Sequence, residues 1–362
     1  MVYVVERFVV NQTSRLHILN CAILGAMCKA ALHSWFQTAK RSLPWRENPT
    51  PYRVWVSEIM LQQTRASVVV GYFERWMQLF PDVETLSRAP LEQVIKAWEG
   101  LGYYSRARNL HAAAQEIVRN HEGRVPGNRD ALLGLPGLGS YTAGAILSFG
   151  FRQRAAAVDG NVTRVMCRYA WIDERVDRTG TRKKIERVTE EFLDEKEPWV
   201  TAEALIELGA TVCTPRPKCG ECPLQVGCEA FRRNAADALP LLAERAKTVQ
   251  LRRTVLVIEA GEFVLVKKNT EALMRDLWEF PFIEGNKIPK TWMQVPLQLE
   301  HRLQTVKHSF TRFSATLFPI CFRTNKRLPV EDFTWVKLSD LTTLPFSSGH
   351  RKIVEELCAS CT

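Results

Sequence analysis

The sequence has 362 residues, of which 46% are hydrophobic and 24% charged, so it is long enough for two domains and is not a disordered chain. A formal net charge of +10 favours a polyanionic partner, with nucleic acid as the first candidate, although a basic soluble enzyme would show the same balance. No apolar run reaches the roughly 18 residues of a membrane span, and a tight group among the cysteines indicates a metal site in a reducing compartment rather than secreted disulfides.

Residues 1–28 are interpreted as an extension of unclear role. The stretch from Leu16 to Met27 is moderately apolar, but His17 and Asn20 interrupt it and no small-residue cleavage site follows. We therefore expect a dispensable extension instead of a signal peptide, with Met27 as a candidate start.

The next segment, residues 29–233, has an almost wholly helical pattern. Apolar residues recur at helical spacing, as at Val69, Phe73, Met77 and Phe80. A further helix is predicted over residues 201–212, with Thr201 as its N-cap. This part of the chain is therefore expected to be mainly α.

Beyond it, residues 234–250 lose clear periodicity and are interpreted as an interdomain linker. Strands are predicted at residues 254–258, 263–266 and 315–322 from β-branched and apolar runs. Ala260 and Gly261 separate the first two runs and indicate a hairpin. Residues 251–362 are therefore expected to form a separate α+β domain.

Four cysteines form the most specific local signal. They are Cys213, Cys219, Cys222 and Cys228, with gaps of five, two and five residues. Four thiolates this close can hold one [4Fe–4S] cluster, because each iron needs one cysteine sulfur. Zinc sites with four cysteines usually consist of two Cys-x2-Cys pairs, and only one close pair is present, so the spacing favours iron–sulfur over zinc.

A glycine-rich turn precedes the helix predicted over residues 142–149. Gly137 and Gly139 lie in the sequence Leu-Pro-Gly-Leu-Gly-Ser-Tyr-Thr. Glycines let the backbone approach a phosphate closely, and a helix start offers free N–H groups. Gly-Leu-Gly alone fits a plain turn between helices equally well, but the flanking residues favour a DNA-binding helix–hairpin–helix motif.

Asp159 begins another predicted helix, in the sequence Val-Asp-Gly-Asn-Val. One interpretation is that its side chain only caps this helix. The other is a catalytic carboxylate, which its position about 20 residues after the hairpin favours.

Glu58 is a second candidate carboxylate. It lies among Trp55, Ile59 and Met60, and apolar surroundings raise the pKa of a carboxyl group, which suits a general acid near neutral pH. The alternative is a solvated helix residue. The adjoining residues 61–64, Leu-Gln-Gln-Thr, are suited to a wedge in DNA.

Together these motifs resemble the helix–hairpin–helix DNA glycosylases with an iron–sulfur cluster, most closely the MutY-type adenine glycosylases. The resemblance begins near Met27 and continues to the C-terminus. It is carried by LPWRENPTPYRVWVSEIMLQQTR, WEGLGYYSRARNLHAAA, LPGLGSYTAGAI, AVDGNVTRV and ALIELGATVC. It implies a mainly α catalytic region with an iron–sulfur module, followed by a C-terminal α+β Nudix-like domain.

The resemblance also implies a chemistry. Glu58 matches the acid that protonates the imidazole ring of an extrahelical adenine, and Asp159 matches the carboxylate that stabilises the oxocarbenium-like sugar. Tyr141 stands where the related endonuclease III-type lyases have a Schiff-base lysine. A phenol cannot form a Schiff base, so the resemblance implies a monofunctional enzyme in which Tyr141 assists at the sugar.

Further residues match substrate and DNA contacts of the family. Arg46 and Glu203 match the pocket that holds the flipped adenine. Residues expected to contact the DNA or wedge the opposite strand are Leu61, Gln62, Gln63, Thr64, Tyr103, Gly137, Gly139 and Asn161. The lesion-recognition loop of the family, Phe-Ser-His, aligns with Phe310, Thr311 and Arg312.

The sequence departs from the family at two places. The first cysteine gap has five residues where the family has six, so the cluster loop is tighter. Arg312 replaces an imidazole with a fixed cation, which bears on the preference for 8-oxoguanine and could serve nonspecific phosphate contact. The magnesium-binding acidic signature of Nudix hydrolases is missing, so we expect this domain to recognise and not to hydrolyse.

The expected function is removal of adenine paired with 8-oxoguanine or guanine in double-stranded DNA. We expect a monomeric bacterial protein of the cytoplasm, associated with the nucleoid. A pyrimidine-lesion glycosylase/lyase, a noncatalytic binder of damaged DNA and a zinc-ribbon regulator are the alternatives.

Overall fold

The computed structural model describes residues 24–244, 247–271, 273–285 and 287–359. The chain divides into two compact units, each built from separate stretches of sequence. The first comprises Met1–Gln62 with Arg124–Glu244, and the second comprises Gln63–Gly123 with Arg245–Thr362. Most of the expected N-terminal extension, residues 1–23, lies outside the described residues.

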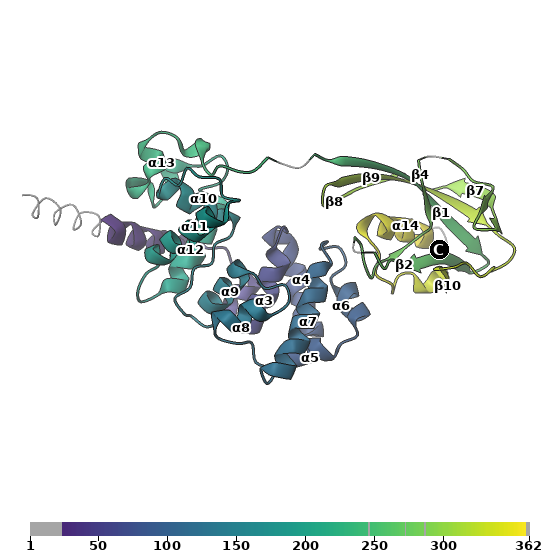
Figure 1. Ribbon diagram of the computed structural model, residues 1–362, viewed down its shortest axis with the longest axis horizontal. Helices are drawn as coiled ribbons and strands as arrows, with labels where there is room; N and C mark the ends of the chain where they lie inside the picture. Colours follow the sequence, from purple (N-terminus) through teal and green to yellow (C-terminus); the bar gives the residue numbers. More distant parts are fainter. Residues whose placement is uncertain (1–23, 245–246, 272, 286, 360–362) are drawn as a thin grey trace, which may run out of the picture. The chain divides into compact units, whose positions relative to one another are not determined.

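The first unit is helical (Figure 1). A helix over residues 24–39 is followed by α2 (Pro44–Glu47), α3 (Pro51–Leu61), α8 (Arg129–Gly134), α9 (Ser140–Ala145), α10 (Gly160–Tyr169), α11 (Thr179–Phe192), α12 (Pro198–Thr211) and α13 (Glu229–Arg232). Its core joins Leu32 and Phe36 of the first helix to Val165 of α10 and Leu208 of α12. The first helix therefore belongs to the core of this unit.

Helix α3 is buried almost all round, which places Glu58 in the interior. Thr50 caps the helix by accepting a hydrogen bond from the N–H of Arg53, and Pro51 occupies the first turn, where a missing N–H costs nothing. Its residues from Val54 to Met60 are all buried. A helix that is apolar on all sides needs packing on all sides, so a carboxyl group in it is withdrawn from solvent.

The predicted hairpin joins α8 to α9, with Gly137 in the left-handed region at φ 77°. The predicted helix 142–149 is present as α9 followed by a π-helical turn, Ile146–Gly150. The N-cap predicted at Thr201 is wrong, because Pro198 starts α12 three residues earlier. Inside the helix, the Thr201 hydroxyl accepts a hydrogen bond from Asp194 N at 3.1 Å.

The second unit combines a helical segment with a sheet domain. The helices are α4 (Ala66–Leu79), α5 (Val83–Arg88), α6 (Leu91–Ala97) and α7 (Ser105–Asn120). The sheet has eight strands, β1 (Val249–Ala260), β2 (Phe263–Lys268), β3 (Trp278–Glu279), β4 (Phe282–Glu284), β7 (Gln298–Arg302), β8 (Val306–Phe310), β9 (Phe313–Arg323) and β10 (Thr334–Lys337). A two-stranded sheet, β5 (Thr291–Trp292) and β6 (Val295–Pro296), and helix α14 (Ser348–Ala359) complete the domain.

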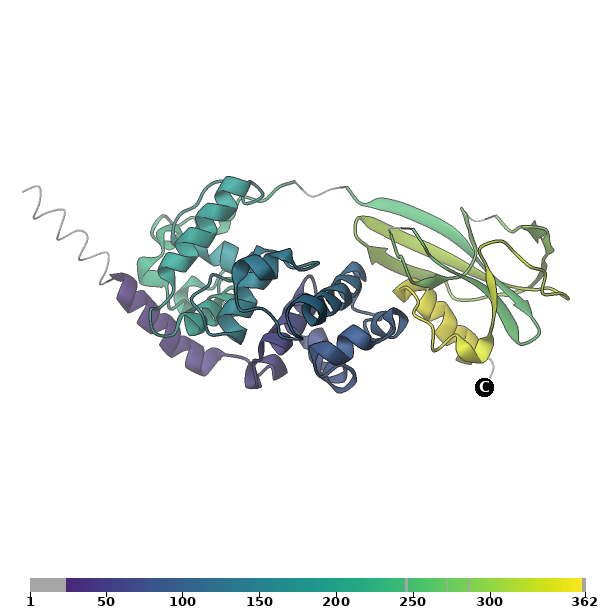
Figure 2. The ribbon, with the colours of Figure 1, turned by 60° about the horizontal axis from the view of Figure 1, so that its bottom comes forward.

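The larger sheet has the order β10-β2-β1-β9-β7, in which the central pair β1 and β9 is parallel and the other pairs are antiparallel. Side chains alternate along β1, so Val255 and Val257 pack on one face with α14, while Leu256 and Ile258 pack on the other. Figure 2 shows α14 lying along one face of this sheet. The predicted hairpin at Gly261 and the predicted strands are confirmed.

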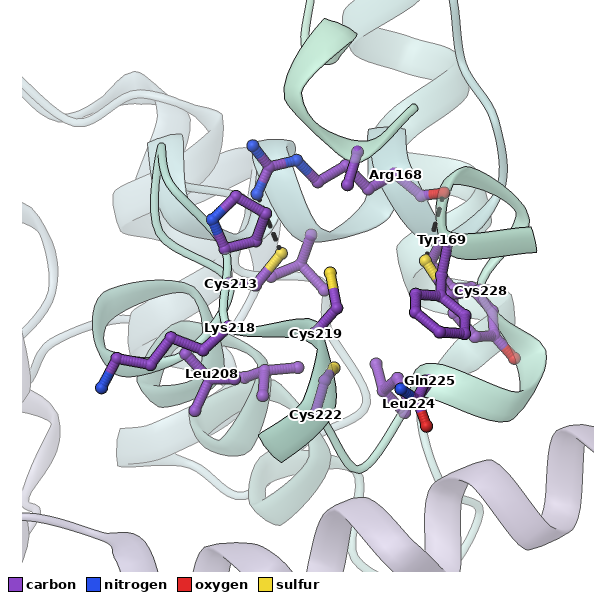
Figure 3. A pocket seen from close by; sticks show the side chains of 15 residues that line it. Arg168, Tyr169, Leu208, Cys213, Lys218, Cys219, Cys222, Leu224, Gln225 and Cys228 are labelled. Carbon is purple, nitrogen blue, oxygen red and sulfur yellow. Dashed lines mark hydrogen bonds between the residues drawn. The ribbon is translucent and has the colours of Figure 1, made fainter. Parts of the chain in front are cut away.

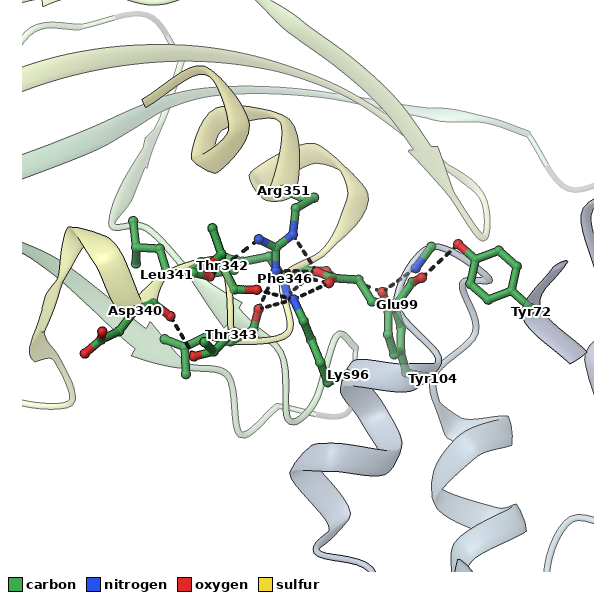
Figure 4. A network of polar contacts seen from close by, with 12 residues as sticks. Tyr72, Lys96, Glu99, Tyr104, Asp340, Leu341, Thr342, Thr343, Phe346 and Arg351 are labelled. Carbon is green, nitrogen blue, oxygen red and sulfur yellow. Dashed lines mark hydrogen bonds and ion pairs between the residues drawn. The ribbon is translucent and has the colours of Figure 1, made fainter. Parts of the chain in front are cut away.

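A polar network ties the helical segment to the sheet domain within the second unit (Figure 4). Glu99 accepts hydrogen bonds from Arg351 Nε and from the N–H of Phe346, both at 2.8 Å. Lys96 donates to Glu99 at 2.7 Å and to the carbonyl of Thr342 at 2.6 Å. These contacts join residues about 250 positions apart, which explains why the two stretches form one compact unit.

No described helix is both long enough and apolar enough to cross a membrane.

Candidate active site

Glu58 and Tyr141 meet in the interior of the first unit. The Tyr141 hydroxyl, on α9, donates a hydrogen bond to Glu58 Oε2, on α3. Burial raises the pKa of Glu58 to about 7, the hydrogen bond from Tyr141 opposes this rise, and the neighbouring Asp159 adds to it. Burial and the same carboxylates raise the pKa of the Tyr141 phenol well above its ordinary value. The raised pKa predicted for Glu58 is confirmed, whereas its catalytic role stays a prediction.

Asp159 has the position of a helix cap, and its catalytic role stays a prediction. It is the N-cap of α10, and its Oδ1 accepts the N–H of Val162 at 2.7 Å. Its Oδ2 accepts from the side-chain amide of Asn161 at 2.7 Å. Burial raises the pKa of Asp159 and these hydrogen bonds oppose the rise, so the cap also favours the ionised carboxylate. Because its charge acts on Glu58 and Tyr141, the cap and the buried acid belong to one cluster.

Asn161 connects this cluster to helix α12. Its Oδ1 accepts from Arg164 at 2.9 Å, and Arg164 also donates to the carbonyls of Gly209 and Cys213, both at 2.7 Å. A Cβ on Gly209 would lie 2.6 Å from the Cβ of Asn161, so only glycine permits this approach. The start of α10 is thus fixed from two sides.

A second group of charges surrounds Arg46. Its Nε lies 3.8 Å from Glu203 Oε2, and its Nη2 lies 2.9 Å from Glu207 Oε2. Arg41 donates to the other oxygen of Glu207 at 2.5 Å. The structure therefore brings the predicted Arg46 and Glu203 together, and their charges act on Glu58.

Sequence reasoning missed Glu207 and Arg41. The side chain of Glu207 is 0% exposed, although it carries two arginine partners. The available signal was its place inside ALIELGATVC, four residues after Glu203, since residues at this spacing share one helix face.

The remaining predicted DNA contacts are divided between the two units. Leu61 ends α3, and Gln62 donates to Thr142 Oγ1 at 3.4 Å, both within the first unit. Gln63, Thr64 and Tyr103 belong to the second unit. Gln63 and Tyr103 have positive φ values of 60° and 49°, a strain that often marks functional positions.

The predicted hairpin exposes a helix start without a side-chain cap. Gly139 is the N-cap of α9, and nothing lies within 4 Å of where its Cβ would be. Ser140 accepts from Arg129 and donates to Glu186, each at 2.6 Å, which fixes the turn. The role of this turn in phosphate binding stays a prediction.

The predicted recognition loop is the two-residue turn of the β8–β9 hairpin. Phe310 pairs with Phe313 across the ladder, so Thr311 and Arg312 form the exposed tip. Thr311 has a positive φ of 47°, and the Arg312 guanidinium lies 5.5 Å from the centre of the Phe313 ring.

The four predicted metal-binding cysteines line one pocket (Figure 3). Most of the other lining residues, such as Val165, Leu208 and Leu224, are apolar. In the described part of the chain, no three His, Cys, Asp or Glu side chains converge as the ligands of one ion would. The donor set itself, four thiols around one largely apolar pocket, fits the ligands of an iron–sulfur cluster.

Arg168 holds the shortened first loop of this group. Its side chain is buried and donates to Cys213 Sγ at 3.3 Å and to the carbonyls of Thr214 at 2.7 Å and Pro215 at 3.2 Å. Its Nε donates to the carbonyl of Leu239 at 3.0 Å. One guanidinium thus ties the loop to residues beyond the last cysteine.

Comparison with known proteins agrees with this architecture. Residues 56–192 match the HhH-GPD superfamily of base excision DNA repair proteins, and residues 253–356 match the NUDIX domain. An adenine DNA glycosylase of Buchnera aphidicola subsp. Schizaphis graminum is 30% identical over 341 residues, which cover 89% of this chain and 96% of that protein. The chain belongs to the adenine DNA glycosylase family. The predicted family and fold class are confirmed.

Other members of the adenine DNA glycosylase family are matched over a smaller share of their length. The mouse adenine DNA glycosylase is 42% identical over 227 residues, 60% of this chain and 44% of that protein. The chain thus spans less than half the length of such mammalian relatives. Among solved structures, a thermostable thymine-DNA glycosylase is similar with a TM-score of 0.55 and 27% identity, covering 59% of this chain and 99% of that one.

Proposed function

We propose that the protein excises adenine mispaired with 8-oxoguanine or guanine in double-stranded DNA, by hydrolysis of the N-glycosidic bond. The observation that carries this proposal is the cluster that buried Glu58 forms with half-buried Tyr141 and Asp159. It combines a carboxyl group whose pKa is about 7 with a second carboxylate that hydrogen bonds hold in place. Acid and anion together suit the cleavage of a glycosidic bond.

In the proposed reaction the adenosine leaves the base stack and enters the first unit. Because its pKa is raised to about 7, Glu58 can carry a proton near neutral pH, and it donates this proton to the imidazole ring of adenine. The bond between C1′ and the base breaks, and its electron pair leaves with the protonated adenine. Asp159 stabilises the positive charge that develops on the sugar. Water then adds to C1′, and the proton that it loses goes to a carboxylate of the cluster, so that Glu58 is protonated again for the next turnover.

The proposed enzyme is monofunctional. Tyr141 is hydrogen-bonded to Glu58, and its phenol lacks the amine that a Schiff base requires. Its phenol also keeps its proton at neutral pH, so it can donate a hydrogen bond to Glu58 throughout the working range.

We further propose that Cys213, Cys219, Cys222 and Cys228 hold a [4Fe–4S] cluster. When bound, the cluster would cross-link four points of this segment. A brown protein with about four irons per chain supports the proposal, whereas a colourless protein containing zinc would overturn it.

The deciding experiment compares duplexes that carry A·8-oxoguanine, A·G and A·T pairs. Free adenine and strand cleavage are scored separately, with Glu58→Gln as the matched inactive variant. We expect adenine release from the two mispairs, none from A·T, and strand breaks only after alkali. Tight binding without release would indicate a noncatalytic binder. A covalent adduct trapped by borohydride, with release of a damaged pyrimidine, would indicate the glycosylase/lyase.

A further inference from the structure

Glu207 is a buried carboxylate that the proposed reaction does not use. It lies on α12 one turn after Glu203, and its side chain is fully buried. Its Oε1 accepts from Arg41 Nε at 2.5 Å, and its Oε2 lies 2.9 Å from Arg46 Nη2 and 3.2 Å from Arg41 Nη2. Two guanidinium groups therefore share a single carboxylate.

This arrangement keeps Glu207 ionised. Burial by itself would raise the pKa of Glu207, but the two arginines lower it below its ordinary value. A buried anion is tolerated only where it is paired, and removing one partner of such a pair is strongly unfavourable. The pairing is thus an obligatory feature of the folded site.

The contacts of Arg46 show what Glu207 does. Arg46 has two acidic neighbours, and it lies closer to Glu207, at 2.9 Å, than to Glu203, at 3.8 Å. Its Nη1 donates to the carbonyl of Arg41 at 3.2 Å, and its guanidinium lies 5.7 Å from the centre of the Phe36 ring. Glu207 makes the shortest of these contacts, so it sets where the charge of Arg46 lies.

We propose that Glu207 is a positioning residue, which fixes Arg46 beside Glu203 and Glu58 and thereby sets the charge of the pocket that takes the adenine. This inference rests on the proposed function. Glu203 is left only loosely paired, so its carboxyl group stays available to the base. Without Glu207, Arg46 would be free to pair with Glu203 and to approach Glu58.

The charges around Glu58 and Glu207 determine whether the pKa of Glu58 rises or falls when Glu207 or Arg41 is replaced. Tyr141, Asp159, Arg46 and Glu203 face Glu58, and Arg41, Arg46 and Glu203 face Glu207. Arg46 lowers the pKa of Glu58, so an Arg46 no longer neutralised by Glu207 would lower it further. Removal of Arg41 has the opposite sign, because Arg46 would then be the remaining partner of Glu207 and its charge would be more fully neutralised.

The test uses Glu207→Gln, which keeps the shape and removes the charge, and Glu207→Asp, which restores the charge. Two quantities are measured in the full-length protein. One is the pH profile of adenine release in single turnover. The other is the titration of the Glu58 carboxyl by difference infrared spectroscopy without DNA, assigned by its loss in Glu58→Gln.

For Glu207→Gln we expect the titration midpoint of Glu58 to fall by about 0.5 pH unit or more, because the charge of Arg46 is no longer neutralised. Adenine release should slow at least ~10-fold, as is typical of a misplaced pocket residue. Glu207→Asp should recover part of both. Glu174→Gln is the control, since Glu174 is bonded to Lys184 at the surface of the same unit, and it should change neither quantity.

Arg41→Gln keeps the proposal testable if Glu207→Gln does not fold, because the Arg41 side chain is 44% exposed. Here the midpoint of Glu58 should rise. An unchanged midpoint in every folded variant would overturn the positioning role. If the wild-type protein releases no adenine but the midpoints still move in opposite directions, the proposed function fails and the role of Glu207 stands.

Discussion

The buried acid should make the protein less stable as the pH rises. The pKa of Glu58 rises from its ordinary value of 4.5 to about 7 on folding, chiefly because the side chain is buried. Each pKa unit corresponds to about 1.4 kcal/mol, so ionised Glu58 costs about 3 kcal/mol of folding free energy above pH 7. Glu58→Gln removes this cost, since the amide carries no charge at any pH.

The sign follows from proton linkage. Below pH 4.5 the Glu58 carboxyl is neutral in the folded and the unfolded state, so its ionisation should make little difference between the unfolding free energies of Glu58→Gln and wild type. Between pH 4.5 and 7 the unfolded chain loses its proton first, so the wild type becomes less stable relative to the variant as the pH rises. Above pH 7 the difference should remain constant at about 3 kcal/mol.

Urea unfolding between pH 5.5 and 8.5 measures this difference, with iron content and adenine release recorded for each sample. Glu174→Gln serves as the control, because a surface carboxyl with a lowered pKa stays ionised over the whole range. Its difference from wild type should not depend on pH. A difference between Glu58→Gln and wild type that is also independent of pH would show that the pKa of Glu58 is not raised.

Three further outcomes follow from the contacts. Tyr141→Phe removes the hydrogen bond that favours ionised Glu58, so the basic limb of the rate profile should move up by about one pH unit; a downward move would contradict the assigned direction of that bond. Gly209→Ala places a Cβ against Asn161, so it should lower the free energy of unfolding by about 1–3 kcal/mol and slow adenine release. Wild-type values in calorimetry and kinetics would show that the backbone has room for the added methyl group. Arg351→Met removes the cation from the network of the second unit, and faster hydrogen exchange in α6 and α14 should report its loosening; unchanged exchange would show that apolar packing suffices there.

Local patterns were sufficient for much of the fold. The strands around Gly261, the glycine turn before α9 and the group of four cysteines depend on neighbours within a few residues, so the sequence could predict them. The start of α12 shows the limit. Thr201 has the chemistry of an N-cap, but Pro198 is better placed in the first turn, and the threonine hydroxyl bonds elsewhere.

The charged part of the site depends on contacts over long sequence separations. Arg41 and Glu207 are 166 residues apart, and nothing in either neighbourhood predicts that they pair. The sequence offered a cap or a catalytic carboxylate as alternatives for Asp159, and the structure shows a cap whose charge also raises the pKa of Glu58. Both contacts depend on how the helices pack against one another, which the periodicity of the sequence alone does not determine.

The path of the chain has a practical consequence for dissecting the protein. The polypeptide crosses between its units after Gln62, again after Gly123 and a third time near Glu244. Cutting it at the last crossing leaves the first unit whole but splits the second, since Lys96 and Glu99 stay behind while their partners on and before α14 are lost. The shortened protein would expose the charged groups of this network to solvent, so its behaviour would mix the loss of the sheet domain with damage to the helices that remain.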